Sequence, residues 1–97
     1  MKKQYDLFDR YLLTEGADDV LNGLCSSYFR KRYREEMSDI PDQDLIEHCT
    51  SKIKKYHLMK NTPSNFQNLE RMDEIIKIYS PLLRRLDDEE YLLMKAR

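Results

Sequence analysis

The chain has 97 residues, of which 40% are hydrophobic and 36% charged. It can therefore bury one modest core, and we predict a single domain over residues 1–97. The formal net charge of −1 excludes a whole-molecule field that would draw the protein to nucleic acid or to an anionic membrane. No apolar run approaches the roughly 20 residues of a membrane-spanning helix.

The cysteine content indicates a reducing compartment. Cys25 and Cys49 are the two cysteines, and no CxxC motif is present, which is typical of proteins without a disulfide framework. Asp6, Asp9 and Arg10 interrupt the apolar segment that a signal peptide would need near the N-terminus. We therefore expect a cytoplasmic protein.

Apolar residues recur at helical spacing along nearly the whole chain, and the period-two alternation of strands is absent. The sequence predicts an all-α fold, a compact bundle of four to five short antiparallel helices. The first is expected over about 3–14, with Tyr5, Phe8 and Leu12 facing inward and Gly16 ending it.

The next segment, 17–40, allows two interpretations. Phe29, Tyr33 and Met37 form a stripe turned away from the apolar residues that precede it. Either Asn22-Gly23 breaks the helix, so that this stripe faces the core, or the helix stays straight and the stripe is a docking surface for a partner.

Proline residues mark the remaining helices. One helix is predicted from Pro41, another from Thr62-Pro63, and Pro81 either starts a fifth or kinks one long helix. The residues expected to face inward on these helices are Leu45, Ile46, Cys49, Ile53, Tyr56, Leu69, Met72, Ile76, Tyr79, Leu82, Leu83, Leu86, Leu93 and Met94.

Basic side chains at positions 30, 31, 32 and 34 alternate with the aromatic ones. Their place after the acidic start of the segment is the order that the helix macrodipole favours. Lys31 can pair with Glu35, and Arg32 with Glu36. A nucleic-acid-binding regulator that uses Arg30–Arg34 with Lys52–Lys55, and Tyr56 or His57 to stack a base, is the alternative interpretation.

The last segment carries the acidic run Asp87 to Glu90. Glu90 falls on the inward face there, whereas Tyr91 and Leu92 fall outside it. Either the chain end frays, or an aromatic side chain surrounded by carboxylates binds a basic partner.

No pattern indicates an enzyme, a metal site or a cofactor, because His48, Cys49 and His57 lack ligand spacing and no phosphate-binding glycine loop is present. We predict an interaction protein: an adaptor, or an inhibitor of the immunity-protein or antitoxin kind. Its partner would be another protein, such as a basic toxin or nuclease, and a homodimer is left open. The candidate partner-binding residues are Phe29, Arg30, Tyr33, Arg34, Met37, Asp87, Asp88, Glu90 and Tyr91.

Overall fold

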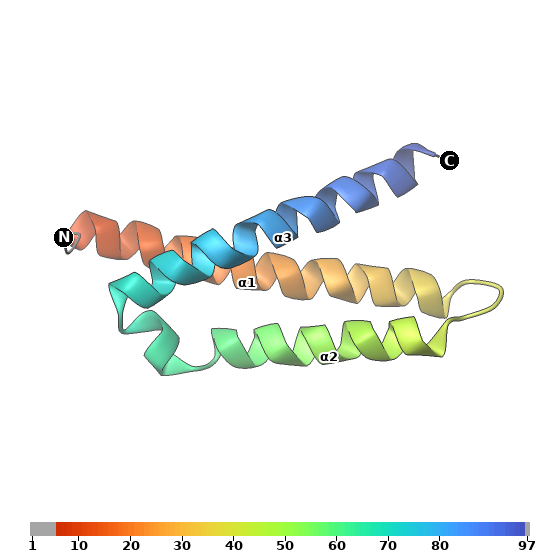
Figure 1. Cartoon of the computed structure of the whole chain (residues 1–97), viewed down its shortest axis with the longest axis horizontal. Helices are drawn as coiled ribbons and strands as arrows, with labels where there is room; N and C mark the ends of the chain where they lie inside the picture. The colour runs from red at the N-terminus through yellow and green to blue at the C-terminus, as the bar shows by residue number, and fades with distance from the viewer. Residues whose placement is uncertain (1–5, 97) are drawn as a thin grey trace.

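The computed structural model describes residues 6–96 and folds them into three α-helices and one short 3-10 helix (Figure 1). The helices are α1 (Leu7–Glu36), α2 (Gln43–Lys60), η1 (Pro63–Phe66) and α3 (Leu69–Lys95). α2 runs antiparallel to α1, and α3 returns in the direction of α1 (Figure 1). The predicted all-α class is confirmed. The prediction of four to five short helices is wrong, because the described residues form three α-helices, two of which are long.

α1 is continuous past both of its glycines. It begins at a reciprocal cap, in which the Asp9 amide donates to Asp6 Oδ1 (2.8 Å) and the Asp6 amide donates to Asp9 Oδ2 (3.1 Å). Gly16 and Gly23 keep the helical conformation. The predictions that Gly16 ends a helix and that Asn22-Gly23 breaks one are therefore wrong.

The glycines instead let α3 approach α1 closely. A Cβ atom at Gly16 would lie 2.8 Å from Ile76 Cδ1, and one at Gly23 would lie 2.8 Å from Leu83 Cδ2. Since the two glycines are seven residues apart, as are Ile76 and Leu83, the two parallel helices meet in a repeating register. One further heptad along, this register brings Arg30 against Glu90.

Side-chain caps begin the later helices. Asp42 Oδ1 accepts from the amides of Asp44 (3.0 Å) and Leu45 (3.2 Å), so α2 begins after Asp42 rather than at Pro41. Thr62-Pro63 starts only η1, and Asn68 caps α3. Pro81 lies inside α3, and the interpretation that it starts a separate helix is wrong.

The core lies where the three helices meet. Its centre is the Tyr56 ring, which stacks on Tyr28 (centroids 6.1 Å apart) and meets Tyr79 edge-on (5.5 Å). The buried apolar residues are Ala17, Val20, Leu21, Leu24, Tyr28, Cys49, Tyr56, Met72, Ile75 and Leu86. The inward faces predicted for α2 and for the first part of α3 are thus confirmed with one exception, since their members are buried or packed against this core. The exception is Ile46, which is half-buried and is not among the side chains packed against the core.

Both ends of the bundle depart from the predicted inward faces. Phe8 and Leu12 in α1 are exposed, as are Leu93 and Met94 in α3, so these four predictions are wrong. Tyr5 lies outside the described residues. In Figure 1 the C-terminal end of α3 lies away from α2, which explains why its last apolar residues find no helix to pack against.

Candidate partner-binding surface

The aromatic stripe of α1 faces solvent. Phe29, Tyr33 and Met37 are 54%, 58% and 66% exposed, and Ile40 in the following loop is exposed as well. A straight α1 causes this exposure, because α2 and α3 pack on its other sides. The interpretation that places the stripe in the core is therefore wrong.

A shallow hollow of about 350 Å³ lies beside the stripe, between α1 and α2. Phe29 and Ile53 form its apolar sides, and Cys25 lies within it. The Arg32 guanidinium lies over the Phe29 ring, 4.9 Å from its centroid. The stripe and the hollow together form an apolar surface with a cation at its edge. Such a surface is better suited to contact with a side chain of another protein than to contact with water.

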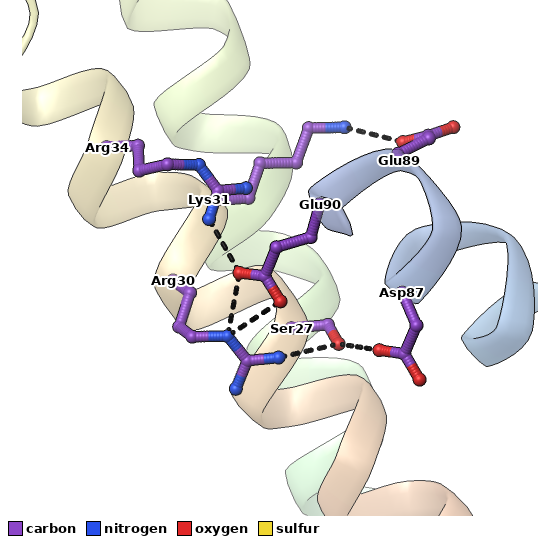
Figure 2. Close-up of polar contacts among 7 residues, drawn as sticks. All are labelled: Ser27, Arg30, Lys31, Arg34, Asp87, Glu89 and Glu90. Atoms are coloured by element: carbon purple, nitrogen blue, oxygen red, sulfur yellow. Dashed lines mark hydrogen bonds and ion pairs between the residues drawn. The ribbon is translucent and has the colours of Figure 1, made fainter. Parts of the chain in front are cut away.

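The arginines predicted beside the stripe turn toward α3 instead. Arg30 Nε donates to both carboxylate oxygens of Glu90 (3.0 and 2.8 Å), and Arg34 donates to the same carboxylate at 2.7 Å (Figure 2). Two predicted surfaces, one basic and one acidic, thus meet as a single ion-pair network across the α1–α3 seam. Lys31 Nζ lies 3.9 Å from Glu89, so the predicted Lys31–Glu35 pair is replaced by one between helices.

The network changes the titration of its members. The hydrogen bond from Arg30, followed by that from Arg34, holds the pKa of the Glu90 carboxyl below its ordinary value of 4.5, although partial burial acts in the opposite direction. The same hydrogen bond raises the pKa of Arg30. Glu90 is therefore a charged structural link between α1 and α3.

The other predicted acidic residues lie on both sides of this network. Asp87 accepts a hydrogen bond from the Ser27 hydroxyl at 3.3 Å (Figure 2). Asp88 is exposed on α3. Tyr91 is also exposed, with Lys95 Nζ 5.8 Å from its ring centroid. Glu90 and Asp87 form hydrogen bonds within the chain. Asp88 and Tyr91 are therefore the predicted partner-binding residues of α3 that face solvent.

A pocket of about 320 Å³ is lined by all three helices, toward the C-terminal end of α3 (Figure 1). Leu45 of α2 and Leu86 and Leu93 of α3 are its apolar lining residues, and Lys31 and Glu89 line it as well. Sequence reasoning missed this pocket, because it depends on the angle between α3 and the other helices.

The basic residues of the nucleic-acid alternative are largely paired. Besides Arg30 and Arg34, Arg32 lies 3.3 Å from Glu36, which confirms the predicted i, i+4 pair. Tyr56 is buried, so it cannot stack on a base. Lys55 Nζ lies over the rings of Tyr56 and Tyr79.

Both cysteines are free thiols. Burial raises the pKa of Cys25 and of Cys49 above the ordinary value of 9.0, which disfavours the thiolate form that nucleophilic chemistry requires. Over residues 6–96, no group of three or more His, Cys, Asp or Glu side chains is arranged to hold a metal ion. Within the same range, no helix has both the length and the apolar character required to cross a bilayer.

Comparison of the chain with protein-family models, with curated proteins and with solved structures found no match.

Sequence reasoning also missed a second exposed apolar group, at the N-terminal end of α1. It consists of Leu7, Phe8, Tyr11 and Leu12. The signal was present in the spacing: steps of three and four residues connect Phe8 and Tyr11 to Phe29 and Tyr33 along one face. This spacing can be recognised only if α1 is treated as one uninterrupted helix.

Proposed function

We propose that this protein is a small interaction module that binds a partner protein through the exposed face of α1. The observation that carries the proposal is the exposure of Phe29 and Tyr33 on the continuous helix α1, with Met37 exposed at its C-terminal cap. Large side chains held at helical spacing on a preformed helix lose little conformational entropy on binding, so they are suited to anchor a partner. The hollow between Phe29 and Ile53 would receive one side chain of that partner.

Within this proposal the protein acts as an adaptor, or as an inhibitor of the immunity-protein or antitoxin kind. An inhibitor works by covering a functional surface of its target, which requires an exposed binding face and no chemistry of its own. The two free thiols support a place in a reducing compartment such as the cytoplasm. A basic target, such as a toxin or nuclease, would find its complementary charge at Asp88, since Glu90 is neutralised by two arginines and Glu89 pairs with Lys31.

Site-specific photo-cross-linking tests the proposal. A photoreactive phenylalanine analogue at Tyr33 should cross-link a different protein in host cells, and the purified partner should bind the chain in calorimetry. The same analogue at Ser51, which is exposed on α2, is the matched control. Phe29→Ser should weaken the binding of the purified partner at least about tenfold, whereas Ile78→Ser, at a residue of α3 that is likewise 54% exposed, should not. Equal cross-linking from positions 33 and 51, or unchanged binding by Phe29→Ser, would contradict the proposal.

A further inference from the structure

The pocket lined by all three helices has an apolar side that the core does not cover. Leu86 belongs to the core, but Leu93, one heptad further along α3, is 57% exposed and still lines the pocket. Leu45 of α2 is half-buried in the same lining. The volume of about 320 Å³ is at the lower end of the roughly 300–1,000 Å³ found for small-molecule sites. A compact apolar group in this pocket would remove Leu45 and Leu93 from water.

Two of the three carboxylates in the lining are neutralised by basic side chains of the same lining. Arg34 donates to Glu90 at 2.7 Å, and Lys31 Nζ lies 3.9 Å from Glu89 (Figure 2). The third carboxylate belongs to Glu35, and no ion pair within residues 6–96 includes it. Three carboxylates against two basic side chains leave the lining with a net charge of −1, which is located at Glu35.

The half-buried Glu35 carboxylate is held in place through one of its oxygens. The main-chain amide of Asp42, the residue that caps α2, donates to Glu35 Oε1 at 2.8 Å. The other oxygen, Oε2, accepts no hydrogen bond from the described part of the chain. A protonated amine could donate to Oε2 in a charge-assisted hydrogen bond, which is stronger than one between neutral groups. An anion, in contrast, would have to displace Glu89 or Glu90 from its basic partner.

We infer that this pocket binds a small amphipathic cation, a molecule that joins a protonated amine to a compact apolar group, as an arylalkylamine does. The amine would pair with Glu35, and the apolar group would lie against Leu45 and Leu93. A lysine side chain of another protein carries the same ammonium group, but its four-carbon chain fills little of a pocket of this volume. The pocket shares no lining residue with the hollow beside Phe29, so the inference goes beyond the proposed function and does not depend on it.

Amide ¹H–¹⁵N NMR of the full chain, titrated with 2-phenylethylamine in an amine-free buffer at pH 7, tests the inference. We expect saturable shifts at the amides of Lys31, Glu35, Leu45 and Leu93, with a dissociation constant of about 1 mM or below for so small a ligand. 2-Phenylethanol lacks the ammonium group and phenylacetate is an anion, so each should bind at least about tenfold more weakly. n-Butylamine, which has the length of a lysine side chain, should also bind at least about tenfold more weakly.

Substitutions in the pocket identify the groups that bind the amine. Glu35→Gln keeps an oxygen that can accept from the Asp42 amide but removes the charge, so it should weaken the binding of 2-phenylethylamine at least about tenfold. Glu36→Gln, at an exposed neighbour outside the lining, should leave the dissociation constant unchanged. Leu93→Ser should also weaken binding, whereas Leu92→Ser, at an exposed residue that does not line the pocket, should not.

Several outcomes would overturn the inference. They are the absence of saturable shifts at the pocket, equal binding of phenylacetate or 2-phenylethanol, and unchanged binding by Glu35→Gln. Equal binding of n-butylamine would overturn it in favour of a lysine side chain as the occupant. The ligand series uses the unmodified chain, so it does not depend on the folding of any variant. The test of the proposed function is separate, because it uses Tyr33, which does not line this pocket.

Discussion

Leu83 of α3 packs over Gly23 of α1 so closely that a Cβ at Gly23 would lie 2.8 Å from Leu83 Cδ2 and 3.1 Å from Cδ1. At Gly16 the corresponding neighbour is the end of the Ile76 side chain, with Cδ1 at 2.8 Å and Cγ1 at 3.5 Å. The two glycines of α1 are thus covered by side chains that differ in how many of their atoms would have to move. At Gly23 a whole branched end must move to admit a methyl group, and at Gly16 one terminal methyl must move.

This difference predicts opposite effects for the same substitution. Alanine has a helix propensity about 1 kcal/mol better than that of glycine, and overpacking costs about 1–3 kcal/mol. Gly16→Ala should leave the free energy of unfolding unchanged or raise it by up to about 1 kcal/mol. Gly23→Ala should lower it by about 1 kcal/mol. Urea denaturation followed by circular dichroism measures both, and a Gly23→Ala protein more stable than Gly16→Ala would show that the seam is looser than the structure indicates.

The Glu90 network should make stability depend on pH. Because the hydrogen bonds from Arg30 and Arg34 lower the pKa of Glu90 in the folded state, its contribution is present above its ordinary value of 4.5 and is lost as the pH falls through the lowered folded pKa. Glu90→Gln should cost about 1 kcal/mol at pH 7, after allowance for the partial exposure of the arginines. This difference from wild type should shrink toward zero in acid.

Glu89→Gln is the matched control for that experiment, because the Lys31–Glu89 pair is longer, at 3.9 Å, and more exposed. It should change the free energy of unfolding by less than about 0.5 kcal/mol at either pH. A difference between wild type and Glu90→Gln that stays constant from pH 7 to acid would show that the charge of Glu90 is not what stabilises the seam.

Pro81 should limit the stability of α3. It lies inside the helix and is exposed, so alanine there introduces no clash and supplies the main-chain N–H that proline lacks. Pro81→Ala should raise the free energy of unfolding by about 1–3 kcal/mol. Calorimetric unfolding measures this change, and a lower melting temperature would indicate that α3 needs the proline to follow the surface of α1.

Two methionines of α3 differ in burial and therefore allow the effect of a core residue to be compared with that of a surface residue. Met72 is fully buried, whereas Met94 is 69% exposed. Met72→Ala should cost about 2–5 kcal/mol through lost burial and the cavity that it leaves, and Met94→Ala should change stability by less than about 0.5 kcal/mol. Similar losses in chemical denaturation would contradict the burial described for these two residues.

Periodicity alone is sufficient to predict the all-α class and, apart from Ile46, the buried faces of α2 and of the first part of α3. The reason is that each of these faces follows from local spacing, as with Cys49 and Tyr56. The boundaries are harder to predict, because glycine and proline, as at Gly16, Gly23 and Pro81, are local signals for a helix end, a break or a kink. In the folded chain the two glycines are sites of close packing between helices, and Pro81 lies on an exposed side.

The candidate site could be predicted only in part. The exposure of Tyr33 depends on α1 being straight, and the pairing of Arg30 with Glu90 depends on the register between two helices that are distant in the sequence. Neither is contained in the spacing of one helix. The register between α1 and α3 determines which charged residues are neutralised.

That register also has a consequence for the folding route. The links between α1 and α3 join residues about sixty positions apart, such as Ser27 with Asp87, whereas Arg32 and Thr50, which join α1 to α2, are separated by 18. Closing the shorter loop loses less entropy, so we expect the α1–α2 hairpin to form first and α3 to dock last. Removing the Glu90 link should then speed unfolding more than it slows refolding in stopped-flow measurements. The C-terminal helix would be the part of the molecule that opens first and closes last.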